Sequence, residues 1–156
     1  RNGLEVTIEP LLAEEQSWNQ WSGPGFRLFN NRIAYFFRVS VRGSGTIKWL
    51  PEKSRIHLNW PDVILEPAAQ ADELLEPLRK AAMTEQQWIL DSEFTKRHRN
   101  AGAFRSQYLP TDPRPNRISG IVAFPMVSPI EHVVALQVDL TIQTPNGPIP
   151  FSWIYD

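Results

Sequence analysis

Histidine is the first candidate for chemistry near neutral pH, and the 156-residue sequence has three: His57, His98 and His132. None repeats at the i, i+4 spacing of a helical metal site, and the chain has no Cys to complete a zinc site. No Gly-x-Ser-x-Gly elbow is present, because Gly43-Ser44-Gly45 is too short, and the common phosphate-binding glycine loops are absent. We therefore expect no metal, no cofactor and no catalytic activity.

Paired carboxylates are the next candidates, because general acid/base catalysis often uses two of them. Local pairs occur at Glu14-Glu15, at Asp72-Glu73 and at Asp91 with Glu93. We interpret them as solvated surface charge or helix N-terminal charge, since adjacent acids on a strand or loop usually face apart or face water. One hypothesis for function is a hydrolase that uses dispersed carboxylates such as Asp62 and Asp91.

Aromatic residues give a richer signal. Trp18 and Trp21 lie in a loop rich in Gly and Pro, and exposed indole rings can stack on sugar rings, with Tyr35 or Tyr108 as further members of such a platform. The other interpretation is that the tryptophans anchor the core and its edges, because large rings dominate core packing. We favour this second interpretation for the six tryptophans, which are Trp18, Trp21, Trp49, Trp60, Trp88 and Trp153.

Alternating apolar residues predict strands before and after the middle of the chain. The N-terminal runs are 4–9 before Pro10, 33–42 before Gly43-Ser44-Gly45, 46–50, and 56–60 before Pro61, with a turn at Pro51 to Lys53. The C-terminal runs are 118–124 before Pro125, 134–142, and 151–155, and the last two are joined by a hairpin at 144–148. Residues 108–115 hold three prolines and predict an irregular connection.

The middle of the chain has a helical pattern instead. Apolar residues from Ala71 to Ala82 recur at helical spacing around Pro77, and Thr84 with Gln87 has the form of a capping box. The sequence therefore predicts a two-helix insertion at about 70–102. Together with about seven short strands, this favours one mainly β domain over residues 1–156, an antiparallel β-sandwich of immunoglobulin-like type, with a barrel as the alternative.

Composition limits the partners. The formal net charge is -1, no block of like charge occurs, and no run reaches the roughly 18 apolar residues that span a bilayer. We therefore expect no nucleic acid and no transmembrane segment. The chain starts at Arg1 rather than Met. This start fits two origins equally well: removal of a signal peptide or lipid-attachment Cys, or an arbitrary start in a cytoplasmic protein.

The segment Gly120-Ile121-Val122-Ala123-Phe124-Pro125, followed by the hairpin at 133–155, resembles the late part of immunoglobulin-like domains in bacterial secreted proteins and lipoproteins, many without an assigned function. The run 33–41 matches an early central strand of that group, whereas the long helical stretch at 71–102 departs from it. The resemblance implies an extracytoplasmic β-sandwich, periplasmic or membrane-anchored through a missing N-terminal segment, and no particular activity.

These observations together predict a non-catalytic protein-interaction or structural module of a bacterial cell envelope, whose partner is another envelope protein. The alternative is a carbohydrate-binding module that uses the exposed loop tryptophans Trp18 and Trp21 with Tyr35 and Tyr108, and its partner would be a glycan.

Overall fold

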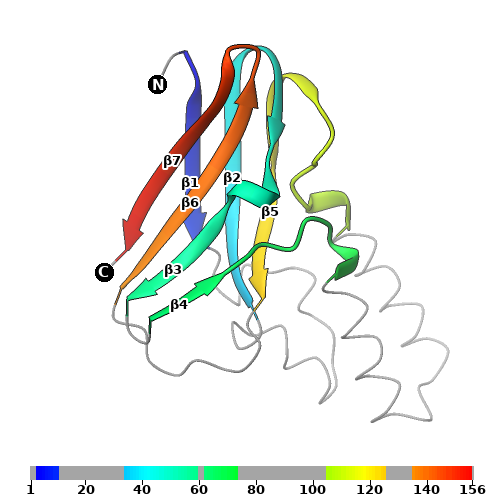
Figure 1. Ribbon diagram of the computed structural model, residues 1–156. Coiled ribbons are helices and arrows are strands. Elements are labelled where there is room, and N and C mark those ends of the chain that lie inside the picture. The colour runs from blue at the N-terminus through cyan, green and yellow to red at the C-terminus, as the bar shows by residue number, and fades with distance from the viewer. Residues whose placement is uncertain (1–2, 11–33, 60–61, 74–104, 126–134, 156) are drawn as a thin grey trace, which may run out of the picture.

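The computed structural model describes residues 3–10, 34–59, 62–73, 105–125 and 135–155 (Figure 1). Each pairing between named strands is antiparallel, which confirms a mainly β, antiparallel chain. The elements are β1 (Glu5–Pro10), β2 (Ala34–Trp49), the 3-10 turn η4 (Pro51–Lys53), β3 (Arg55–Asn59), β4 (Asp62–Leu65), β5 (Arg114–Pro125), β6 (Leu136–Thr144) and β7 (Gly147–Tyr155).

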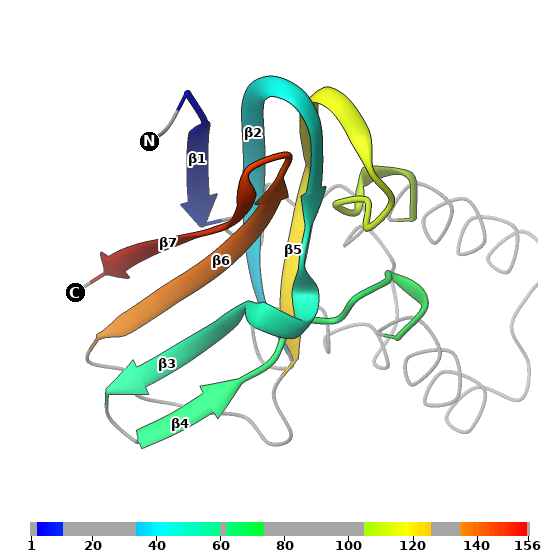
Figure 2. The same cartoon turned by 45° about the horizontal axis from the view of Figure 1, so that its top comes forward.

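The strands form two leaves that share β2. Leaf A contains β1, β2 and β5, and leaf B contains β4, β3, β6 and β7 in that order. The last residues of β2, Lys48 and Trp49, pair with β6 and so join leaf A to leaf B. Figure 2 shows the two leaves running in different directions, with β2 bending over where they meet.

A β-bulge makes this bend possible. The register between β2 and β5 shifts between Arg42 and Thr46, where Gly45 has a φ of 86° and Asn116 a φ of 63°. The backbone N–H of Gly45 donates to Oδ1 of Asn116 at 3.2 Å, which ties the two strands together at the bulge. The prediction that Gly43-Ser44-Gly45 ends the strand is therefore wrong. A bulge bends a strand without ending it, so the expected run at 46–50 mostly continues β2.

Buried side chains from both leaves form one hydrophobic core. Phe37 of β2 packs edge-to-face on Phe124 of β5, with ring centres 5.9 Å apart, and its ring lies 6.1 Å from that of Tyr155 on β7. The contact between Phe37 and Tyr155 links leaf A directly to leaf B. Among the largest of the buried side chains are Trp49, Phe37, Phe124, Ile47, Ile56, Leu58, Leu109 and Ile118.

The structure confirms the C-terminal hairpin. Thr144 pairs with Gly147 across a turn of Pro145 and Asn146, and Gly147 takes a φ of 111°. The final strand begins at Gly147 rather than at the expected Phe151, because Pro148 and Pro150 lie within the ladder without breaking it.

Three further predictions meet different outcomes. The turn at Pro51 to Lys53 is confirmed as η4. The sequence does not predict β4, because Pro61 ends the last N-terminal alternating run, yet Asp62–Leu65 pairs with β3. Of the expected two-helix insertion at about 70–102, only residues 70–73 are described, so this prediction lies outside the described residues. No helix within the described ranges is long and apolar enough to cross a membrane.

Candidate functional site: the outer face of leaf B

One row of side chains crosses all four strands of leaf B on the side away from the core. Strand register places Ile64 of β4 opposite His57 of β3, His57 opposite Gln137 of β6, and Gln137 opposite Ile154 of β7. Residues directly opposite one another point to the same face of a sheet. The neighbouring positions along each strand are buried, such as Val138 of β6, or partly buried against the core. The row therefore lies on the outer face.

The two ends of this row are apolar and exposed. Ile64 is 57% exposed and Ile154 is 68% exposed, and they are the exposed large hydrophobic residues among those that the structure describes. Both lie on strands at the margins of leaf B. Single exposed apolar residues are common on protein surfaces, but two that share one cross-strand row mark a face that can bury apolar area against a partner.

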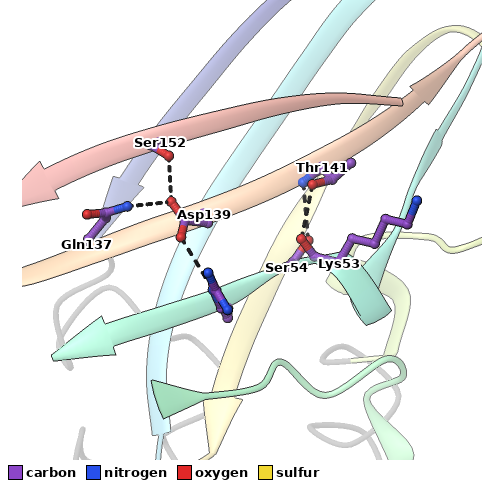
Figure 3. Close-up of polar contacts among 7 residues, drawn as sticks. Lys53, Ser54, Gln137, Asp139, Thr141 and Ser152 are labelled. Atoms are coloured by element: carbon purple, nitrogen blue, oxygen red, sulfur yellow. Dashed lines mark hydrogen bonds and ion pairs between the residues drawn. The ribbon is translucent and has the colours of Figure 1, made fainter. Parts of the chain in front are cut away.

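Between them, Asp139 of β6 organises a polar centre (Figure 3). Its Oδ1 accepts hydrogen bonds from Oγ of Ser152 on β7 at 2.5 Å and from Nε2 of Gln137 at 2.9 Å. Its Oδ2 lies 3.7 Å from Nε of Arg55 on β3. The Asp139 side chain is only 21% exposed, against 60% for Arg55. One carboxylate thus ties three strands together and fixes the surface of the sheet.

This centre does not form a nucleophilic catalytic group. A serine nucleophile needs a base that accepts its proton and a partner that orients the base. The hydroxyl of Ser152 donates to a carboxylate, while Nε2 of His57 lies 2.6 Å from Oδ1 of Asp62. No group of three or more His, Asp or Glu residues that could hold a metal ion occurs in the described part of the chain. The geometry is that of an ordered polar surface.

A second cluster fixes η4 against β6 (Figure 3). Oγ of the buried Ser54 accepts from Nε1 of Trp49 at 3.0 Å and from the backbone N–H of Thr141 at 3.3 Å, and it donates to the carbonyl of Leu50 at 2.8 Å. Oγ1 of Thr141 donates to the carbonyl of Lys53 at 3.0 Å. Trp49 is fully buried, so for this residue the structure confirms the interpretation that the tryptophans anchor the core.

Tyr108, proposed from the sequence as part of a binding platform, is 7% exposed. Its hydroxyl donates to the carbonyl of Ala68 and accepts from the backbone N–H of Ala123 at 3.2 Å. Burial raises its pKa far above the ordinary value of 10.0, and the nearby negative charge of Glu73 acts in the same direction, while the bond to Ala123 opposes both. Tyr108 therefore packs and satisfies backbone groups in the structure described.

The other platform candidates do not gather around Tyr108 in the described residues. Tyr35 of β2 is half-buried opposite Phe124, and its partial burial raises its pKa. Trp18 and Trp21 lie outside the described residues. The carbohydrate-binding alternative stays a prediction, and a glycan array is the direct test of it.

The candidate acidic residues that are described take part in local surface contacts. Asp72 lies 2.5 Å from Nε of Arg105, and Oε2 of Glu73 accepts from the backbone N–H of Ala69 at 3.1 Å. Asp62, with a side chain 84% exposed, contacts His57. These contacts agree with the interpretation of surface charge. The remaining candidate acids and histidines lie outside the described residues: Glu14, Glu15, Asp91, Glu93, His98 and His132.

A polar groove of about 620 Å³ lies beside β5, and arginines line part of it. Arg114 lies 3.3 Å from Oδ2 of Asp112, and this hydrogen bond holds the pKa of Asp112 below its usual value. Arg105 is held by Asp72, whereas Arg117 lies opposite Arg42 in the ladder of β2 and β5. Because acidic residues offset two of these arginines, the groove lacks the concentrated charge of a dedicated anion site.

Comparisons with known proteins return no match, whether to a protein family, a curated protein or a solved structure. The geometry of leaf B is therefore the basis for assigning a function. Sequence reasoning missed Ile64, Ile154 and Asp139 as site residues. One signal was available: Ile154 stands at a position where the alternation of Phe151, Trp153 and Tyr155 assigns the side chain to the outer face.

Proposed function

We propose that this chain is a non-catalytic protein-interaction or structural module of a bacterial cell envelope, and that it binds its partner through the outer face of leaf B. The observation that carries the proposal is the row from Ile64 to Ile154, with exposed apolar ends and a polar middle. Protein interfaces combine apolar contacts with polar groups in this way, although bulk hydrophobicity does not distinguish them from other surfaces.

The order of the polar centre supports binding. Asp139 holds Ser152 and Gln137 in hydrogen bonds and lies near Arg55, so the side chains are positioned before a partner arrives. Ordering side chains on binding costs about 0.5–1.5 kcal/mol for each mobile side chain. A surface whose side chains are already held avoids part of this cost.

The finer assignment of the fold belongs to the same proposal. An immunoglobulin-like sandwich is supported by two antiparallel leaves that share a core and by the resemblance at Gly120 to Pro125. The proposed extracytoplasmic location rests on that resemblance alone. Cell fractionation, with mass spectrometry of the mature N-terminus, tests the location: a cytoplasmic protein would contradict it.

Site-specific photo-crosslinking tests the contact surface. A benzophenone amino acid is placed at Ile64 or at Gln137 on the outer face of leaf B, and the control places it at Thr7, which is exposed on the outer face of leaf A. After irradiation in the native bacterium, we expect one adduct of defined mass from the two leaf B positions and none from Thr7. Equal adducts from all three positions, or none from leaf B, would contradict the proposal.

A further inference from the structure

β7 lies at a margin of leaf B, and the direction of its backbone groups determines which residues face its outer edge. The carbonyl of Thr141 on β6 accepts from Leu50 at 3.0 Å, and its N–H donates to Ser54 at 3.3 Å. Both backbone groups of Thr141 therefore point away from β7. Pro150 is opposite Thr141 in the ladder, so the backbone of Pro150 points away from β6.

Backbone direction alternates along a strand, so four residues of β7 direct their backbone away from β6, toward the outer edge. These residues are Pro148, Pro150, Ser152 and Ile154. Proline has no N–H, so the first half of the edge lacks the donors that a new strand would need. The second half keeps the donors of Ser152 and Ile154, and within the described residues β7 pairs only with β6.

The composition of β7 favours pairing with a strand like itself. Gly147–Tyr155 contains no charged residue, so two copies of this strand meet without charge repulsion. The other strands at the margins of the leaves differ from β7 in charge or length. β1 carries Glu5 and Glu9 and ends at Pro10, and β4 has four residues that begin with Asp62. Charge, proline and short length are the usual devices that prevent pairing at strand edges.

We propose that a second copy of this chain pairs antiparallel with β7, with Trp153 opposite Trp153 of the other copy. In this register Ser152 lies opposite Ile154 of the second copy, and each of these residues donates and accepts across the new edge. The prolines stay outside the donor positions of this ladder. Pairing joins the two copies of leaf B into one sheet, so this proposal goes beyond the contact surface proposed above.

The inner side of β7 gives the pair an apolar component. Phe151, Trp153 and Tyr155 pack against the core but are only partly buried, and the rings of Phe151 and Trp153 stack with centres 6.1 Å apart. Opposite residues in a pair without hydrogen bonds have closely spaced side chains. The two copies of Trp153 therefore cover one another at the twofold axis.

Two variants at Ser152 separate the backbone donor from the side chain. Ser152→Pro removes the outward N–H, while Ser152→Ala removes only the hydroxyl that binds Asp139. In sedimentation equilibrium over a concentration series, we expect the wild type and Ser152→Ala to dimerise with similar dissociation constants. Ser152→Pro should raise the constant about tenfold or more, because the symmetric pair loses two hydrogen bonds. A monomeric wild type, or equal constants for both variants, would overturn the proposal.

Disulfide crosslinking tests the register, and the natural chain has no Cys to interfere. Ser152→Cys and Ile154→Cys change two exposed side chains, and each variant is first checked for wild-type thermal unfolding. Opposite positions lie within the Cα separation of about 4.4–6.8 Å that a disulfide needs. We expect the equimolar mixture to form dimers faster than either variant alone. If neither variant alone nor the mixture is crosslinked, or if the mixture shows no advantage, this register is wrong.

Failure here is distinguishable from failure of the proposed function. The crosslinking position Ile64 lies on β4, at the opposite margin of leaf B from β7. A specific adduct at Ile64 with a monomeric protein would retain the contact surface and remove the strand pairing. A dimer without that adduct would retain the strand pairing and remove the contact surface.

Discussion

The outer edge of β5 and the outer edge of β7 are completed in different ways. At β5, the backbone N–H of Ala68 donates to Ala123 at 2.9 Å and that of Leu109 donates to Ile121 at 2.8 Å. The chain thus covers this edge with two of its own segments, which Figure 1 shows beside β5. At β7, prolines occupy half of the edge, and the described residues supply no strand for the other half.

The chain itself stabilises the β5 edge, whereas the β7 edge keeps backbone groups that can bond to another strand. Ala123 is fully buried and Ile121 is 2% exposed, so the β5 edge behaves as core. On β7, Phe151, Trp153 and Tyr155 are only partly buried. Substitutions at the β5 edge should therefore change the free energy of unfolding, and substitutions at the β7 edge should change association.

The largest expected effect is at Gly120, where the covering segment touches β5. A Cβ added there would lie 2.7 Å from Cα of Leu109 and 2.8 Å from the carbonyl oxygen of Gln107, and backbone atoms cannot move aside cheaply. Gly120→Val should lower the free energy of unfolding by about 3 kcal/mol, the upper part of the range for overpacking. Urea denaturation measures this. Ser119→Thr, at the exposed neighbouring position, is the control and should change it by less than about 0.5 kcal/mol.

The next effect is at Tyr108, whose hydroxyl joins the covering segment to β5. Tyr108→Phe leaves the carbonyl of Ala68 and the N–H of Ala123 without this partner inside the protein. The free energy of unfolding should fall by about 2 kcal/mol, the cost of buried polar groups that lose their bond. Tyr155→Phe on β7 is the matched control, because Tyr155 is only partly buried. If both variants lose equal stability, the two edges do not differ as described.

Alkaline pH should affect the β5 edge more than β7. Burial raises the pKa of Tyr108 far above 10.0, so the unfolded chain releases this proton first. The stabilisation is complete below the unfolded pKa and is lost as pH rises above it. Wild-type stability should fall by about 1 kcal/mol between pH 10 and 11, since one group contributes at most about 1.4 kcal/mol per pH unit. Tyr108→Phe should show a smaller fall than Tyr155→Phe when unfolding is measured across this range.

The smallest effect on stability is expected from the prolines of β7. Replacing both Pro148 and Pro150 with Val restores two outward N–H groups without removing a bond to β6. The free energy of unfolding should fall by about 1 kcal/mol or less, because the unfolded chain becomes more flexible. Light scattering should show stronger association, or larger species, than in the wild type. Unchanged association would mean that these prolines do not restrict the edge.

Local pattern predicted much of the fold. Alternation located strands at 4–9, 33–42, 56–60, 118–124 and 134–142, and Pro10 and Pro125 do close β1 and β5. The hairpin followed from Asn146-Gly147, although the positive φ belongs to Gly147 alone. These features depend on neighbouring residues, which is why the sequence reveals them.

Other features depend on distant residues and were not predictable in this way. Whether Gly45 ends or bends β2 is decided by Asn116, 71 residues later, which accepts its hydrogen bond. Whether Pro150 breaks β7 depends on Thr141, whose backbone points to the other side of β6. The candidate site was missed for the same reason, since Ile64 and Ile154 share a row only through strand register.

Hydrogen exchange at single amides tests the contrast between the two edges most directly. In dilute protein, the amides of Ala68 and Leu109 should exchange slowly, while those of Ser152 and Ile154 should exchange rapidly. In concentrated protein, Ser152 and Ile154 should become protected, and Ala68 and Leu109 should not change. Slow exchange of Ser152 and Ile154 in dilute protein, or rapid exchange at every concentration, would contradict an open β7 edge that pairs with a second copy.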